Sequence, residues 1–402
     1  MEKSFLITDF KAMPDSQKVQ TKEIQACIDA CHLAGGGEII IPAGTFIIGS
    51  IRLYSNMTLR LKSNAILKGS KNLEDYRDFH IPTTIKYLYD PEYIREWNLP
   101  PYYFYAMICA FQEENIAIIG EIGSVIDGQD VFDPNGEEKF RGPMGVILSQ
   151  VKNVDLSGYT FKNSSNWSHT IDGCEKIRIK DVSIKAGHDG FNLHHSTYIH
   201  ISNCSLETGD DCFAGYDVHG LEVTHCYLNT ACNGMRLGGT NLSFSHCNFN
   251  GPGRYPHLSE DSYHTHAIFK YYSVLPDTIL EDSEKILFDS CVIYSADKLF
   301  SYSFGDKELH QVNRPLRELT MENMKISGIR KTSIFKGNGE KVTLTLKNVQ
   351  LSFDEEEPIF LEIDDSVTLV LDHVFFKTPT KIRNLNQELT FSGETTLIVE
   401  NK

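Results

Sequence analysis

Residues 187–235 read GHDGFNLHHSTYIHISNCSLETGDDCFAGYDVHGLEVTHCYLNTACNGM, and one short phrase occurs in them three times, as GHDG, GDDC and CNGM. Asp189 precedes Asp211 by 22 residues, and Asp211 precedes Asn233 by 22 residues. A period of about 22 with a short apolar run in each copy is typical of a parallel β-helix, because one coil cannot bury its hydrophobic face until the next coil stacks on it. We therefore expect equivalent residues of successive copies to lie side by side, about 4.8 Å apart, on one wall.

The same pattern continues over most of the chain. Nine segments each hold two short alternating runs with a polar or glycine bend between them, as a coil with two or three sheets requires. These segments are NVDLSGYTF (153–161), KIRIKDVSI (176–184), YIHISNCSL (198–206), GLEVTHCYL (220–228), NLSFSHCNF (241–249), KILFDSCVI (285–293), ELTMENMKI (318–326), VTLTLKNVQL (342–351) and VTLVLDHVFF (367–376). No tract rich in proline or serine divides them, so we predict an all-β fold with residues 1–402 in a single parallel β-helix domain.

One amphipathic helix is predicted before the strands, over residues 21–34, TKEIQACIDACHLA. Thr21 is a candidate N-cap, and the three glycines 35–37 are a stop signal. We expect this helix to cap the open end of the β-helix, where unpaired backbone would otherwise invite association. Its apolar residues at helical spacing are Ile24, Cys27, Ile28 and Cys31.

Two segments break the period. Residues 77–112 are rich in Tyr, Pro and Trp, and residues 250–266, NGPGRYPHLSEDSYHTH, form a polar loop. Loops that project from a solenoid often border its binding site, so we expect the 250–266 loop near the site. The aromatic insertion has a second interpretation, as a dimer contact or a side-packed subdomain.

The charge balance limits the partners. The chain has 38 basic and 54 acidic residues, a net charge of −16, which argues against nucleic acid and anionic membranes because both need a basic surface. The N-terminal MEKSFLITDFKAMPDSQKV lacks the apolar core of a signal peptide, and no stretch approaches the roughly 18–20 apolar residues that span a bilayer. We expect a cytoplasmic protein without a membrane partner. Its substrate should be neutral, or should be held locally by the site despite the acidic surface.

The ten cysteines follow the repeat. Cys204, Cys226 and Cys247 recur at intervals of 22 and 21 residues, each just before an apolar position. Equivalent places in stacked coils would form an internal column of small hydrophobic side chains. We therefore expect reduced thiols, in agreement with an intracellular setting.

Asp189, Asp210 and Asp211 are the candidate catalytic residues. A single Asp after Gly at a bend is commonly a turn former that caps backbone amides. Three carboxylates in adjacent copies would instead repel one another, which leaves a protonated acid beside an ionised base. Acetal hydrolysis requires that pair, and the spacing of the repeat leaves both the inverting and the retaining route open.

Several motifs together resemble glycoside hydrolase family 28, the polygalacturonase-like family of the pectin-lyase-like superfamily. The motifs are GGGEIIIPAGTFIIGSIRL (35–53), VIDGQ (125–129), NSSNWSHTIDGCEKIRIKDVSI (163–184), HDG, GDDC, CNGMRLGG (232–239) and AIFK (267–270). The similarity covers roughly residues 20–330. It implies a single-stranded right-handed parallel β-helix and a glycoside hydrolase acting on a pectin-derived or related plant-wall oligosaccharide.

The resemblance also implies roles. Asp210 matches the general acid of an inverting mechanism, and Asp189 and Asp211 match the residues that orient and deprotonate the water. Asn233 stands where the family has a histidine, so the proton handling of that histidine would either pass to His188, beside Asp189, or be lost.

The family's Arg-Ile-Lys, which holds a substrate carboxylate, becomes Ile268-Phe269-Lys270 here. The loss of its arginine weakens the bidentate grip on a uronate. Lys270 remains as a point charge, and Arg236 is the candidate that replaces the lost contact, with a surface ion pair as its alternative role.

No cofactor is expected. The histidines 194, 195, 264 and 266 lack the spacing of a zinc site, so we expect no metal and interpret them as solvated loop or ladder residues. Exo action is a hypothesis from the two insertions, which could close one end of an open cleft.

Two other functions remain open. The first is a β-helical polysaccharide lyase, in which Asp189, Asp210 and Asp211 would hold calcium. The second is a carbohydrate-binding β-helix without catalysis, which the Asn233 replacement suggests.

Overall fold

The computed structural model describes residues 3–100, 103–354, 358–385 and 387–399. Its residues pack into two compact units, Met1–Thr208 and Gly209–Lys402. The structure is mostly β in both units, as predicted. That the whole chain forms a single domain stays a prediction.

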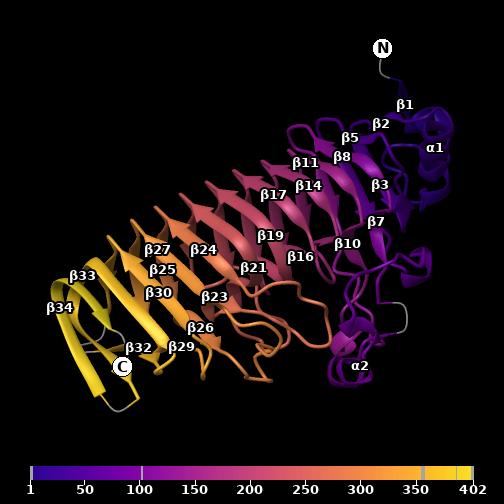
Figure 1. The fold of residues 1–402 in the computed structure, drawn as a ribbon. Coiled ribbons are helices and arrows are strands. Elements are labelled where there is room, and N and C mark those ends of the chain that lie inside the picture. Colours follow the sequence, from indigo (N-terminus) through magenta and orange to yellow (C-terminus); the bar gives the residue numbers. More distant parts are fainter. Residues whose placement is uncertain (1–2, 101–102, 355–357, 386, 400–402) are drawn as a thin grey trace. The chain divides into compact units, whose positions relative to one another are not determined.

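The first unit contains eighteen strands among its described residues, most of them three to six residues long. Figure 1 draws the strands as arrows and colours them along the sequence. They are β1 (Ser4–Leu6), β2 (Gly37–Ile41), β3 (Gly44–Ile48), β4 (Ile51–Arg52), β5 (Met57–Leu61), β6 (Ala65–Gly69), β7 (Ala106–Phe111), β8 (Glu114–Gly120), β9 (Val125–Asp127), β10 (Met144–Ser149), β11 (Lys152–Ser157), β12 (Thr160–Lys162), β13 (His169–Asp172), β14 (Glu175–Lys180), β15 (Ser183–Ala186), β16 (Phe191–His194), β17 (Thr197–Ser202) and β18 (Ser205–Thr208).

From β2 to β15, each strand pairs in parallel with the third strand after it, so that three strands make one coil. One column runs through β2, β5, β8, β11, β14 and β17. Along this column an inward row of aligned side chains is almost fully buried: Met57, Ile116, Val154, Ile177 and Ile199. Burial of one such side chain stabilises the fold by about 1.5–3 kcal/mol, which explains why the apolar period follows the coil.

The second unit contains β19 (Phe213–Thr224), β20 (Tyr227–Thr230), β21 (Asn233–Ser245), β22 (Asn248–Asn250), β23 (Ala267–Tyr271), β24 (Glu284–Asp289), β25 (Val292–Ala296), β26 (Lys298–Ser303), β27 (Glu318–Glu322), β28 (Lys325–Ile329), β29 (Ser333–Lys336), β30 (Val342–Lys347), β31 (Gln350–Ser352), β32 (Ile359–Ile363), β33 (Val367–Asn384) and β34 (Gln387–Val399).

From β21 to β30, each strand of the second unit also pairs in parallel with the third strand after it. β21, β24, β27, β30 and β33 form one column, and its buried row is Leu242, Ile286, Leu319, Leu344 and Leu369. β33 and β34 end the unit as an antiparallel pair. The stacked-coil prediction of a parallel β-helix is therefore confirmed within each unit, whereas its right-handed sense stays a prediction.

The bends between strands carry polar ladders. In the first unit the Nδ2 group of Asn115 donates to Oδ1 of Asn56 at 2.7 Å, and Nδ2 of Asn153 donates to Oδ1 of Asn115 at 2.9 Å. All three residues have φ between 57° and 62°, a region that asparagine tolerates better than most residues. The amide ladder satisfies the side chains of successive bends and fixes the stacking register.

Helix α1 spans Thr21–Leu33 and buries all four apolar residues named from the sequence. Thr21 is not its N-cap, because Gln20 holds that position, without a capping hydrogen bond from its side chain. The Thr21 hydroxyl instead accepts a hydrogen bond from the Gly49 amide at 2.8 Å. The helix contacts β1, β2 and β4, and its role as a cap stays a prediction.

The aromatic insertion, residues 77–112, contains helix α2 (Pro91–Trp97), and its residues 101–102 lie outside the described part. Trp97 makes edge contacts with Tyr87 and Tyr93, at centroid distances of 5.2 and 4.9 Å. The insertion therefore has a small aromatic cluster of its own within the first unit. Among the described residues, no helix combines the length and hydrophobicity that a membrane crossing needs.

All ten cysteines lie among the described residues, and all are free and buried. In the second unit the Cys247 amide donates to Sγ of Cys291 at 3.4 Å, and Cys226 precedes a strand that pairs with the strand after Cys247. The predicted internal column is confirmed for Cys226 and Cys247 of this unit, and the reduced state of the thiols stays a prediction.

Candidate active site

Asp210 and Asp211 lie in the bend that leads into β19. The backbone amide of Asp211 donates to Oδ1 of Asp210 at 3.0 Å, so the two side chains are tied to one turn. Asp211 is 1 % exposed, whereas the side chain of Asp210 is 14 % exposed. The pair therefore combines a buried carboxyl with one that can contact a substrate.

Asn233 begins β21 and holds Asp211. Its backbone amide and its Nδ2 group donate to Oδ1 of Asp211 at 3.1 and 2.7 Å, and its carbonyl accepts from the Cys212 amide at 3.0 Å. The predicted contact between successive copies of the repeat is confirmed for this step. The residue that replaces the family histidine thus acts as a hydrogen-bond donor to a carboxylate.

The electrostatics of Asp211 reflect both its burial and its neighbours. Burial, followed by the charge of Asp210, raises the pKa of Asp211 above its usual range. The charges of Arg236 and Lys270 and the hydrogen bond from Asn233 oppose that rise. A carboxyl with a raised pKa beside a second carboxyl is suited to hold one shared proton.

Arg236 and Lys270 are register partners in β21 and β23, so the two cations stand on adjacent coils. The guanidinium carbon of Arg236 lies 3.8 Å from the centroid of the Tyr272 ring, a cation–π contact. Burial, together with the nearby Arg236, lowers the pKa of Lys270. Arg236 therefore packs on an aromatic ring beside a second cation.

A cavity of about 290 Å³ adjoins these residues, and Asn233, Lys270, Lys298 and Lys331 take part in its lining. Asp297, also on this wall, accepts ion pairs from Arg330 at 2.9 Å and from Lys331 at 2.6 Å. The remaining members of the lining are His266, Ala267, Ser301 and Leu309. Because Asp297 is already paired with Arg330 and Lys331, the lysines of the lining can bind an anionic ligand.

The polar loop, residues 250–266, brings a histidine to the pair Asp210 and Asp211. His257 Nε2 lies 3.6 Å from Oδ1 of Asp210. Burial alone would lower the pKa of His257, but the hydrogen bond and charge of Asp210 outweigh it, and the pKa lies above its usual range. A protonated imidazole beside Asp210 can supply a proton to it.

The sequence analysis did not select His257. The loop is fixed to the coil by Asn229, which donates to the Pro252 carbonyl at 2.8 Å and accepts from the Arg254 amide at 2.8 Å. Near the C-terminal end of the loop, the Thr265 hydroxyl donates a hydrogen bond to the Thr230 carbonyl at 2.6 Å. Nothing in the loop's composition indicates these anchors, and only its position after the third copy of the repeat could have suggested the histidine.

Asp189 and His188 belong to the first unit. Asp189 is buried and accepts a hydrogen bond from Nδ2 of Asn192, while the ring of His188 stacks on Phe140 at a centroid distance of 5.6 Å. Asp210 and Asp211 belong to the second unit. The meeting of all three aspartates, and the transfer of a proton role to His188, stay predictions.

The four histidines that the sequence analysis compared with zinc ligands, at positions 194, 195, 264 and 266, differ in environment. His194 is buried, so its expected exposure to solvent is wrong, because its ring stacks on Trp167 at a centroid distance of 5.7 Å. His264 is exposed, as expected, and His195 is half-buried. His266 is half-buried, with Nδ1 3.9 Å from Sγ of Cys232.

A model of the glycosyl hydrolases family 28 matches residues 31–241, which is more than half of the chain. The chain belongs to glycosyl hydrolase family 28. The resemblance seen in the motifs is therefore confirmed, and the two-aspartate bend of this family 28 chain lies within the matched range.

This family 28 chain is 27 % identical over 230 residues to a probable polygalacturonase of Vitis vinifera, covering 54 % of the chain and 45 % of the relative. It is 25 % identical over 225 residues to an exopolygalacturonase of Zea mays, covering 52 % and 48 %. The chain thus spans about half the length of the curated relatives it matches. The crystal structure of a Thermotoga maritima exopolygalacturonase superposes with a TM-score of 0.65 at 16 % identity, covering 99 % and 96 % of the two chains, which shows a shared fold.

Proposed function

We propose that the protein is an O-glycosyl hydrolase that cleaves a glycosidic bond in a pectin-derived or related plant-wall oligosaccharide, with inversion and from the chain end. The observation that carries this proposal is the pair Asp210 and Asp211, one partly exposed and one buried, at a bend beside a cationic cavity. The polygalacturonase names of the relatives support the substrate class.

Asp210 is the general acid in this proposal because it is the more exposed carboxyl and can reach the leaving oxygen. Asp211, held by two hydrogen bonds from Asn233, is a fixed acceptor that orients and deprotonates water, with Asp189 as its expected partner. Hydrogen bonds from Asn233 favour the ionised form of Asp211, which a base requires. His257 can return the proton that Asp210 has donated.

The cationic wall supports an acidic sugar. A uronate carboxylate placed in the cavity would meet Lys270 and Lys298, while Asp297 is neutralised by Arg330 and Lys331. Arg236, packed on Tyr272, presents a guanidinium on the adjacent coil. A bidentate guanidinium and an ammonium together recognise a carboxylate better than either does alone.

Exo action and a cytoplasmic location also belong to the proposal. The 250–266 loop, which reaches Asp210, supports restricted access on one side of the pair. The ten free, buried thiols are compatible with a reducing compartment.

The test is incubation with defined oligogalacturonides and related plant-wall oligosaccharides, with products read by mass and their anomeric configuration by NMR. Addition of one water with an inverted new end supports the proposal, and an unsaturated uronide without added water would establish a lyase instead. Asp210→Asn should reduce kcat/KM by at least about 100-fold, the scale of general acid catalysis. Asp372→Asn, which alters an exposed carboxylate paired with His373, is the matched control and should leave the rate unchanged.

A further inference from the structure

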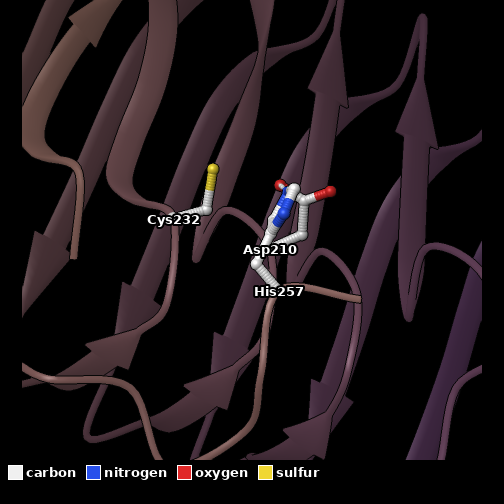
Figure 2. A group of neighbouring side chains, drawn as sticks. All are labelled: Asp210, Cys232 and His257. Carbon is white, nitrogen blue, oxygen red and sulfur yellow. Dashed lines mark ion pairs between the residues drawn. The ribbon is translucent and has the colours of Figure 1, made fainter. Parts of the chain in front are cut away.

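Three side chains that can each ligate a metal ion meet in the second unit. Asp210, Cys232 and His257 each offer one ligand atom, and these atoms all lie within 4.8 Å of one another (Figure 2). The residues come from three places in the chain: the bend before β19, the turn before β21 and the 250–266 loop. Glycoside hydrolysis has no use for the thiol of Cys232, so the cluster is not explained by the proposed function.

The spacing of the donors fits a tetrahedral ion. With bond lengths of about 2.0–2.1 Å to nitrogen and oxygen and about 2.3 Å to sulfur, neighbouring donors around zinc lie about 3.3–3.6 Å apart. His257 Nε2 and Asp210 Oδ1 are 3.6 Å apart, and Cys232 Sγ is 3.9 Å from Nδ1 of His266. A closure of a few tenths of an ångström would bring these two pairs to a coordination edge, whereas the other separations within the three-residue cluster reach up to 4.8 Å and need a larger closure.

His266 has the surroundings of a fourth ligand. Its Nδ1 atom points to Cys232, and its Nε2 atom lies 3.2 Å from a carboxylate oxygen of Glu260. A metal-ligating imidazole usually donates its other N–H to a carboxylate, which fixes the tautomer and orients the ring. This contact is independent of the three-residue cluster and indicates the same centre.

The backbone holds the donors in place. The Cys232 amide donates to the Thr230 hydroxyl at 2.9 Å, and the Cys232 carbonyl accepts from the His266 amide at 2.6 Å. The rings of His257 and His266 have a centroid separation of 5.9 Å. Thiol and imidazole donors favour Zn²⁺ over Ca²⁺ or Mg²⁺, which prefer oxygen ligands.

We propose that Asp210, Cys232 and His257, with His266 as fourth donor, bind one divalent cation of the zinc class. Binding converts the Cys232 thiol to a thiolate and releases its proton to solvent. Because Asp210 is also the proposed general acid, a bound cation would remove its proton and stop hydrolysis. This inhibitory effect rests on the proposed function, whereas the binding site itself does not.

The binding experiment titrates the chelator-treated full chain with Zn²⁺ and, separately, with Co²⁺. We expect one equivalent of Zn²⁺ to bind, and Co²⁺ to give the visible absorption of a tetrahedral site with a thiolate charge-transfer band. Cys232→Ser should abolish that band and weaken Zn²⁺ binding by at least about 10-fold, while Cys226→Ser, a buried thiol of the same unit outside the cluster, should retain both.

Two further variants keep the test decisive if Cys232→Ser fails to fold. His257→Asn should weaken Zn²⁺ binding, and Glu260→Gln should weaken it about 10-fold by removing the outer carboxylate. His373→Asn, an exposed histidine, should not change it. The absence of saturable binding, or binding that is equal in Cys232→Ser and wild type, would rule the site out.

The inhibition experiment compares each variant's rate in Zn²⁺ with its own rate in chelator. The ratio should be far below one for wild type and approach one for Cys232→Ser. If no variant hydrolyses any glycan, the proposed function fails while the titration still decides the metal site. If wild type hydrolyses glycans equally with and without Zn²⁺, the inhibitory part of the proposal is wrong.

Discussion

The substitution Asn233→Ala tests how the structure controls Asp211. It removes the Nδ2 donor at 2.7 Å and leaves the backbone amide at 3.1 Å, so Asp211 loses one of its two hydrogen bonds from Asn233. A hydrogen bond to a buried charged group contributes about 1.5–3 kcal/mol, and 1.36 kcal/mol corresponds to about one pKa unit. The pKa of Asp211 should therefore rise by about 1–2 units.

The effect on stability depends on pH in a defined direction. The folded-state pKa of Asp211 is already raised, so its ionisation disfavours the fold as pH rises through that value. In the variant, unfolding by urea should show a loss of about 1.5–3 kcal/mol above the folded-state pKa. Below the unfolded value of about 3.9, where the carboxyl is protonated in both states, the loss should become small.

The same substitution has a kinetic readout. If Asp211 is the base, the acidic limb of the kcat/KM profile should move up by about 1–2 pH units in Asn233→Ala. Asn348→Ala is the control, because its amide donates at 2.7 Å to exposed Asn323 and should cost about 1 kcal/mol or less at every pH. An equal loss of stability at acidic and neutral pH would refute the argued link between Asn233 and the charge of Asp211.

Three further predictions concern the surrounding charges. Because the pKa of His257 is raised by Asp210, the pairing should stabilise the loop below the unfolded histidine value of about 6.5 and weaken as pH rises through the folded value. The protection factors of the loop amides, which correct for base-catalysed exchange, should therefore fall over that range, and they should not do so in His257→Asn. Lys270→Met should raise KM for uronate oligosaccharides by at least about 10-fold and leave KM for neutral ones unchanged, as measured by initial rates. Tyr272→Leu should remove the cation–π contact that holds Arg236 in place, at a cost of about 0.5–2 kcal/mol. The KM for uronates should rise with little change in kcat, and an unchanged KM would contradict the cation–π contribution.

The fold was predictable from the sequence because the coil repeats a local pattern. Each of the nine segments corresponds to two strands, except that the last one, residues 367–376, runs without interruption inside β33. Alternating burial and bend residues are local properties, so the sequence carries them directly. Thr21 was misjudged because its hydroxyl accepts from Gly49, a contact 28 residues away that no helix rule contains.

The site was predictable only where the repeat places it. Asn233 contacts Asp211 because both occupy the same position in successive coils. His257 has no such counterpart, since it reaches Asp210 through a loop whose path depends on Asn229. Contacts made by an insertion depend on tertiary anchors, which periodicity does not encode.

The replacement at Asn233 and the insertion of the loop occur in the same coil. Register pairing advances by 22 residues from Phe213 to Met235 but by 34 residues from Asn233 to Ala267, because the loop lies in between. The coil that carries an amide in place of a titratable histidine therefore also carries the loop that brings His257 to Asp210. An amide at position 233 can orient Asp211 but cannot exchange a proton, and an imidazole on the other carboxyl of the pair can. The two changes are chemically complementary, which favours a retained proton relay over a catalytically inactive β-helix.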